Sequence, residues 1–202
     1  HRDLHSFPTR RSSDLVLADG RADADTIAAD LLAQAEHDTD ALPILVALDA
    51  GLIDRVNAAL ERQLATLPTA ETARAALANG FAVLAANMDE AISACDLLAP
   101  EHLELMCDGE DEVAKRLRHY GGLFVGPRSA EVFGDYGAGP NHVLPTSGTA
   151  RRTGGLSVFT FLRVRTWLKL DNAASLVGDA AKLARMEGLE AHARAAEIRG
   201  KS

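Results

Sequence analysis

The sequence predicts an α/β protein, with a mostly parallel sheet covered by helices and a helical appendage at its C-terminal end. Short apolar runs of strand length alternate with segments of helical spacing as far as about residue 125. From about residue 155 onward only helical periodicity remains. With 202 residues, 47% of them hydrophobic, the chain is long enough for one substantial core. Alternation of this kind is typical of a mostly parallel sheet covered by helices on both faces.

The first strand and helix open the alternation. Residues 15–18 (LVLA) have the pattern of the end of a strand. Asp25 or a neighbour is expected to cap the helix that follows, because a short side-chain oxygen can accept the free N–H groups of a first turn. Ile27, Leu31 and Ala35 recur in this helix at helical spacing.

The alternation then continues through the predicted sheet. A strand is expected at the apolar run 43–48. The helix after it is amphipathic, with apolar positions at Leu52, Val56, Leu60 and Leu64. Further strands are expected at 81–84, 103–106 and 123–125, with helices at 88–97 and 110–118 between them. Beyond the sheet, helices are expected at about 157–168, 172–187 and 189–199.

These patterns divide the chain into three parts. Residues 1–14 have no initiator methionine and no periodicity, and we expect them to be an unrelated, disordered leader. Residues 15–155 form the predicted α/β domain. Residues 156–202 form a helical tail, because the strand-length runs stop before them.

Composition excludes several classes of partner. The formal net charge is −8, so the surface is expected to repel nucleic-acid phosphates and anionic lipid. No apolar run approaches the roughly 20 residues of a membrane-spanning helix, and the start lacks the pattern of a secretory signal. We therefore expect a soluble, cytoplasmic protein. Cys95 and Cys107 are too few for a disulfide framework or a thiolate zinc site, and Cys95 is expected in the core.

The segment that most suggests a functional site is the loop at residues 134–146, GDYGAGPNHVLPT. It combines an acid and a histidine with three glycines in too little chain to build a core. Glycine permits backbone conformations closed to other residues and lets a ligand approach closely. The loop is therefore suited to holding a small molecule or a metal ion. An ordinary turn-rich connection is the alternative.

Four segments together resemble one enzyme family, histidinol dehydrogenase. The loop 134–146 is similar to the signature loop of that family, residues 29–38 (ADLLAQAEHD) to one of its helices, and residues 99–103 (APEHL) to its catalytic segment. Residues 187–192 (EGLEAH) are similar to the family's terminal acid and histidine. The segments occur in the family's order, and the resemblance covers about residues 15–198. It implies that the α/β domain is an incomplete Rossmann-like domain.

The resemblance implies a zinc site formed by Gln34, His37, Asp135 and His192. By spacing alone, Gln34 and His37 share a face of a helix and can reach one ion, or they form a solvated polar face. Two imidazoles, a carboxylate and an amide oxygen, with no thiolate, suit an open catalytic zinc site, although Mn²⁺ or Co²⁺ also fits such a set.

Glu101 and His102 are the expected catalytic pair. Adjacent side chains at the entry to a strand point to opposite sides unless the backbone is irregular, so spacing alone leaves ordinary surface positions as the alternative. The resemblance implies that His102 is the general acid/base on the alcohol and that Glu101 activates the water that attacks the aldehyde. It also implies that the substrate is contacted by His102, Asp135, His142, Glu187 and His192.

The tail carries the last two of these residues. Glu187 continues an apolar stripe of a predicted helix, where an acid needs a partner because burying an unpaired carboxylate is costly. Gly188 is expected to end that helix, which would let Glu187 and His192 converge. The alternative is an acid at a fraying helix end. The resemblance implies a homodimer, in which both residues reach across the interface and complete the other subunit's site.

The reaction implied by the resemblance is the oxidation of L-histidinol through L-histidinal to L-histidine in histidine biosynthesis, with two hydride transfers to NAD. No G-x-G-x-x-G fingerprint follows a strand, so we expect an inactive C-terminal fragment without cofactor-binding residues. Two alternatives stay open: a relative that oxidises another primary alcohol, such as a sulfonated diol, and a non-catalytic metal-binding or dimerisation fragment. Ser12 falls near a substrate-contacting serine of the family, although its flanking residues do not match.

Overall fold

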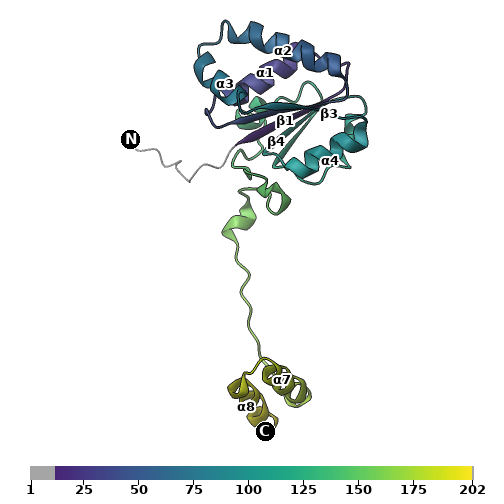
Figure 1. Cartoon of the computed structure of the whole chain (residues 1–202). Coiled ribbons are helices and arrows are strands. Elements are labelled where there is room, and N and C mark those ends of the chain that lie inside the picture. Colours follow the sequence, from purple (N-terminus) through teal and green to yellow (C-terminus); the bar gives the residue numbers. More distant parts are fainter. Residues whose placement is uncertain (1–11, 202) are drawn as a thin grey trace, which may run out of the picture. The chain divides into compact units, whose positions relative to one another are not determined.

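The computed structural model describes residues 12–201. The chain forms two compact units that divide between residues 161 and 162 (Figure 1). The first unit is the α/β domain and the second is a pair of helices. Expectations for residues 1–11 lie outside the described residues.

The first unit contains a five-stranded sheet in which all the paired strands are parallel, as predicted. Its order is β3-β2-β1-β4-β5. Strands β2 and β3 therefore lie on one side of β1, and β4 and β5 lie on the other. The strands are β1 (Ser13–Ala18), β2 (Leu42–Ala47), β3 (Phe81–Leu84), β4 (His102–Met106) and β5 (Gly122–Val125).

Helices cover both faces of this sheet (Figure 1). One face carries α1 (Ala24–Ala35), α2 (Ala50–Leu64) and α3 (Ala70–Leu77). The other carries α4 (Met88–Leu98) and α5 (Glu110–Ala114). Asp23 caps α1 by accepting the N–H of Thr26. Sequence periodicity missed α3, whose eight residues include four alanines and only one large apolar side chain.

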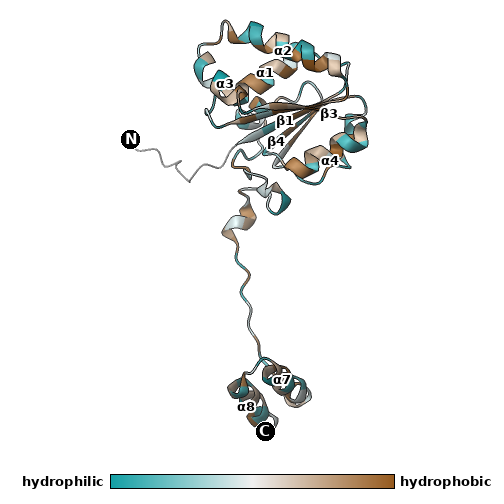
Figure 2. Ribbon diagram, in the orientation of Figure 1, coloured by the Kyte–Doolittle hydropathy of each residue, from teal (hydrophilic) through white to brown (hydrophobic). Residues whose placement is uncertain are grey.

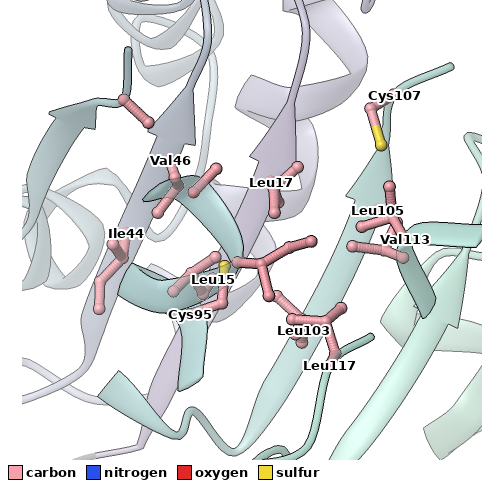
Figure 3. Packing of buried hydrophobic residues seen from close by; sticks show 13 residues of the cluster. Leu15, Leu17, Ile44, Val46, Cys95, Leu103, Leu105, Cys107, Val113 and Leu117 are labelled. Carbon is pink, nitrogen blue, oxygen red and sulfur yellow. The ribbon is translucent and has the colours of Figure 1, made fainter. Parts of the chain in front are cut away.

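Alternation along the strands explains how one sheet supplies two cores. On β1, Leu15 and Leu17 pack with Ile92 and Cys95 of α4, which places Cys95 in the core as predicted (Figure 3). Val16 and Ala18 point to the opposite face and pack with α1 and α2. Strands buried in this way are apolar along most of their length, as the hydropathy colouring shows (Figure 2).

Strand β1 begins inside the segment predicted to be the leader. Ser13 and Asp14, expected in the leader, are the first two residues of β1 and are buried. Ser13 pairs with Leu42 of β2, and Asp14 pairs with His102 of β4. The prediction was wrong because polar side chains interrupt the apolar run there, while the pairing to both neighbouring strands continues. This shift of two residues brings Asp14 into the site described below.

The chain after β5 is mostly irregular. It contains α6 (Glu131–Asp135) and two 3-10 turns, η1 (Thr149–Arg151) and η2 (Val158–Phe161). The predicted helix at 157–168 is wrong beyond η2, since residues 162–170 have no regular structure. The residues there include Val164 and Trp167, which are 94% and 85% exposed. A short segment without a packing surface has little to stabilise a helix.

The second unit contains α7 (Ala174–Met186) and α8 (Glu190–Glu197), followed by the 3-10 turn η3 (Ile198–Lys201). Gly188 ends α7 as predicted, with a left-handed φ of 76°. Within this unit Ala181 and Ala193 are buried. Among the residues that the structure describes, no helix is long and apolar enough to cross a membrane.

Candidate functional site

The candidate site lies at the amino ends of the strands. Because the strands are parallel, β1, β2, β4 and β5 all begin at the same edge of the sheet. Asp14 and His102 lie at this edge, and α1 ends beside it before the chain enters β2. Open α/β sheets usually bind ligands at the opposite edge, beyond the carboxyl ends of the strands. The polar groups therefore do not occupy the usual nucleotide-binding position.

His102 is positioned by the pairing of β1 with β4. Asp14 and His102 are register partners, and both point to the face covered by α1, as Val16 on β1 and Met106 on β4 also do. Nδ1 of His102 contacts a carboxylate oxygen of Asp14 directly. The side chains of His102 and Asp14 are only 8% and 6% exposed. His102 is thus a buried residue with a fixed partner.

Glu101 joins the same polar network through Ser12. The Ser12 hydroxyl donates to a Glu101 carboxylate oxygen at 2.7 Å, and it lies 3.4 Å from Asp14 Oδ2. Ala99 has a left-handed φ of 48°, so the backbone is irregular just before β4. Burial raises the pKa of Glu101. Since Glu101 and His102 are both buried, the surface alternative is wrong.

A further set of carboxyl groups, those of Glu131, Glu104 and Asp30, lies near His102 on the same face of the sheet. Glu131 Oε1 is 3.3 Å from His102 Nδ1, and the Glu131 backbone N–H donates to Glu104 Oε1 at 3.2 Å. Glu104 Oε2 and Asp30 Oδ2 are buried without a hydrogen-bond partner among the described residues. Burial and then repulsion from Asp30 raise the pKa of Glu104 to about 8. Burial and then repulsion from Asp14 raise the pKa of Glu131 to about 9.

Sequence reasoning missed the four carboxyl residues Asp14, Asp30, Glu104 and Glu131. One signal was available for Glu104, an acid two residues after His102 in an apolar strand, because period-two alternation places both on one face. Asp14 and Glu131 depend on strand register and on the path of an irregular segment. Periodicity does not encode either.

A cavity of about 370 Å³ brings together three of the four expected metal ligands, Gln34, His37 and Asp135. Gln34 is buried in the last turn of α1, and His37 follows the helix end, one residue beyond the C-cap Glu36. Asp135 is the last residue of α6. Glu104 and Glu131 line the same cavity, so it adjoins the network around His102.

A second, larger cavity of about 570 Å³ is lined by His102 and Asp135 together with apolar side chains such as Phe124 and Phe133. Asp135 therefore lines both cavities. Gly137 and Gly139 adopt φ values of 127° and 99°, which glycine favours. His142 is exposed in this loop, and the linings of the two cavities do not include it.

Glu187 and His192 lie in the second unit. Glu187 is the C-cap residue of α7, and His192 is in the first turn of α8. Both side chains are exposed. The apolar stripe of α7 is uncovered within this unit, with Leu176 and Leu183 52% and 61% exposed.

The donor groups at the smaller cavity fit a zinc ion. An amide, an imidazole and a carboxylate line this cavity, and such groups would supply three ligands to a zinc ion and leave a position for a fourth. Asp14, His102 and Glu131 also place three potential ligand atoms within 4.8 Å of one another. Because His102 Nδ1 and Asp14 Oδ1 are in direct contact, no ion can lie between those two atoms.

Comparison with known proteins agrees with the segments recognised in the sequence. The histidinol dehydrogenase family model matches residues 7–200. This match begins inside the segment expected to be an unrelated leader, so that expectation is wrong from residue 7 onward. Histidinol dehydrogenases from Nitratidesulfovibrio vulgaris and Thermus thermophilus are 53% and 48% identical over 186 and 187 residues. These alignments cover 91% and 92% of this chain, but 43% and 45% of the relatives.

A solved structure gives the same result. The crystal structure of histidinol dehydrogenase from Elizabethkingia anophelis matches with a TM-score of 0.82 and 34% sequence identity. The match covers 96% of this chain and 45% of that one. The chain thus spans less than half the length of these three proteins. At these identities and with this coverage, the chain belongs to the histidinol dehydrogenase family.

Proposed function

We propose that this chain supplies the zinc-binding and acid–base part of an NAD-dependent histidinol dehydrogenase, which oxidises L-histidinol through L-histidinal to L-histidine. The observation that carries the proposal is the convergence of Gln34, His37 and Asp135 on one cavity beside the buried Glu101 and His102. A metal position next to a shielded base is the arrangement needed to orient an alcohol and remove its proton.

In this proposal the zinc ligands are Gln34, His37 and Asp135, with His192 as the fourth. A bound zinc ion supplies a positive charge and an open coordination position that orient the nitrogen groups of the substrate. Glu131 and Glu104 line the same cavity, and their raised pKa values keep both groups largely protonated and uncharged near neutral pH. Recognition of the substrate in this proposal therefore rests on the metal, and histidinol carries an amine and an imidazole whose nitrogens can bind zinc.

His102 and Glu101 have separate proton-transfer roles in the proposal. His102 takes the hydroxyl proton as the carbon loses hydride to NAD, and it does so again when the hydrated aldehyde is oxidised. Glu101 takes a proton from the water that adds to histidinal. Its raised pKa, caused mainly by burial, brings it closer to the range in which a carboxylate is an effective base.

The tail completes the site from a second copy of the chain in this proposal. Glu187 and His192 are exposed, and the segment leading to them exposes Val164 and Trp167. Exposed apolar surface of this extent is typical of a surface that binds another protein. Placing His192 of the partner at the cavity would supply the fourth zinc ligand, and Glu187 would then contact the substrate, as would His142 from the loop.

A non-catalytic metal-binding or dimerisation role is the second candidate. It is favoured by one observation, the absence of a G-x-G-x-x-G fingerprint from the sequence. In the primary proposal most NAD contacts come from a segment that this chain does not contain, and the chain by itself does not turn over substrate.

The test compares the chain with a version extended by the missing segment of a relative. Both are supplied with zinc, NAD and either histidinol or a sulfonated diol, and NADH formation is measured. The proposal predicts turnover of histidinol by the extended protein and none by the chain alone. Turnover of the diol alone would contradict the substrate assignment. Zinc binding without turnover of either alcohol would select the non-catalytic role.

A further inference from the structure

We infer that Asp14 is a positioning residue that holds the His102 ring by its Nδ1–H and leaves Nε2 as the basic atom facing the larger cavity. The inference rests on the proposed function of His102 as the general acid/base. Asp14, on strand β1, would thus act together with His102 on β4, and Nε2 of His102 would be the ring nitrogen that takes the proton.

The strand pairing fixes the relative position of the two side chains. Asp14 lies on the central strand β1, which is paired on one side to β2 and on the other to β4. His102 is its register partner, and one Asp14 oxygen contacts His102 Nδ1 directly. The Ser12 hydroxyl lies 3.4 Å from the other Asp14 oxygen. Strand pairing on both sides fixes the backbone of Asp14, so its short side chain can hold the His102 ring in one position.

The contact determines which nitrogen is basic. A neutral imidazole has one N–H and one lone pair, and the partner of one nitrogen decides the state of the other. A carboxylate at Nδ1 accepts the N–H, so the lone pair must be on Nε2. No hydrogen bond joins Nε2 to a described residue, and His102 lines the cavity of about 570 Å³. Asp135 lines both cavities, so an alcohol group that extends into the larger cavity from a zinc ion held at Asp135 meets the basic nitrogen.

The neighbouring carboxyl group of Glu131 supports this arrangement. Both Asp14 and Glu131 lie near Nδ1, and burial raises the pKa of each carboxyl group. Two buried carboxyl groups so close together share a proton, because like charges cannot both be stabilised there. The Asp14 oxygen is in contact with Nδ1 whereas that of Glu131 is 3.3 Å away, so the charge is better stabilised on Asp14. The shared proton then remains on Glu131.

The proton and electron balance of the alcohol step follows from this geometry. The substrate C–H bond breaks and its electron pair leaves with the hydrogen as hydride to the nicotinamide of NAD, the oxidant of the proposed reaction. The O–H proton moves to Nε2 of His102. The resulting imidazolium keeps its Nδ1–H on Asp14, whose negative charge stabilises the positive ring.

The first test measures the ring tautomer in the chain as it exists, without requiring activity. Protein labelled with ¹⁵N-histidine is studied by NMR at a pH where the ring is neutral, and His102 is assigned from the signals missing in His102→Gln. We expect a protonated Nδ1 and an unprotonated Nε2. Protonation at Nε2 in the unmodified chain would overturn the inference, and the only variant this measurement needs is a folded His102→Gln for the assignment.

Substitutions then identify the residue that holds the ring. Asp14→Asn should abolish the preference for Nδ1–H, whereas Glu131→Gln should retain it. Asp25→Asn is the matched control, because Asp25 is exposed and its side chain accepts a hydrogen bond from Arg62. An unchanged tautomer in folded Asp14→Asn, or its loss in Glu131→Gln alone, would assign the role to Glu131 and contradict the inference.

Kinetics in the extended enzyme separate positioning from a structural role. Asp14→Asn should lower kcat by ~10²-fold or more, within the usual range for general acid–base catalysis, with little change in KM or zinc content. The acidic limb of the kcat–pH profile should move to lower pH, because the imidazolium has lost its counter-charge. Loss of zinc together with kcat would contradict a positioning role. If the tautomer is as inferred but the extended enzyme does not oxidise histidinol, the proposed function fails and the inference about the ring remains.

Discussion

The two units of the chain differ in which groups they bury. The sheet unit buries a connected set of polar side chains, in which strand pairing sets Asp14 beside His102 and the Ser12 hydroxyl bonds Glu101. The helical tail exposes both of its expected site residues, Glu187 and His192, and much of its apolar stripe. The two catalytic candidates of the sheet unit are therefore buried in a polar network, whereas the expected site residues of the tail face solvent.

The interactions within the tail support this contrast. Its helices are linked by Arg185, which bonds Glu190 and Glu197 at exposed positions. Exposed ion pairs contribute little to stability, because water already solvates both charges well. The buried contact between helices rests on the small residues Ala181 and Ala193. Such a unit gains stability when its apolar side is covered.

The largest expected effect is the loss of metal from the sheet unit. If Gln34, His37 and Asp135 bind one ion, the extended protein should hold about one zinc per chain, and His37→Ala should lose it. His119→Ala should keep its zinc, because His119 does not line the cavity where those ligands meet. Metal analysis after dialysis measures both. Equal loss in the two variants would show that the metal is bound nonspecifically or that the fold is damaged.

The next effect separates the two buried catalytic candidates. Glu101→Gln should slow histidinal oxidation by ~10²–10⁴-fold, because activation of water by a base is needed only for the aldehyde step. Histidinol and zinc binding should remain nearly intact. Single-turnover assays started from histidinal measure the step directly. A parent rate in this variant would remove Glu101 from the mechanism, whereas His102→Ala should impair both oxidations.

A pair of identical substitutions tests the difference in burial itself. Leu103→Ala should lower the unfolding free energy by about 2–5 kcal/mol, because Leu103 of β4 is fully buried in the core between the sheet and α4. Leu168→Ala should change that free energy by less than about 0.5 kcal/mol in dilute protein, because Leu168 is 81% exposed. Denaturant titration of both variants gives the comparison. A large cost for Leu168→Ala at low concentration would show that the segment is packed within one chain.

A further expected effect is a pH dependence of stability that comes from the buried carboxyl groups. Glu131 has its pKa raised from 4.5 to about 9, so the folded state binds more protons than the unfolded state between these values. The unfolding free energy should therefore fall as pH rises through this window, by up to about 1.4 kcal/mol per pH unit for each excess proton. Glu131→Gln should reduce the slope in metal-free protein. Glu112→Gln, at an exposed position, should leave it unchanged.

Apolar periodicity was sufficient to predict most of the sheet unit. The strands at 43–48, 81–84 and 103–106 each match an observed strand to within one residue. The helix predicted at 157–168 fails because Val158, Phe159 and their neighbours are apolar without having a surface to pack on in this chain. A run of apolar residues indicates that a segment becomes buried. It does not show whether the surface that buries the segment belongs to the same chain or to another molecule.

The site was predictable only as far as its residues lie in recognisable segments. Gln34, His37 and Asp135 come from two such segments and do meet at one cavity. Asp14 and Glu131 were missed because their proximity to His102 depends on strand register and on the fold of α6. The expected roles of Glu187 and His192 stay predictions, since both side chains are exposed in the described structure.

Subunit complementation is the measurement that tests the central contrast most directly. His192→Ala and Asp135→Ala variants of the extended enzyme are each expected to be inactive. After mixing and demonstrated subunit exchange, one site of each heterodimer carries both defects and the other carries neither. The account predicts recovery of up to about half of the parent activity per heterodimer, as a two-fold symmetric assembly with shared sites requires. Demonstrated exchange without any recovery would show that the tail serves the site of its own chain.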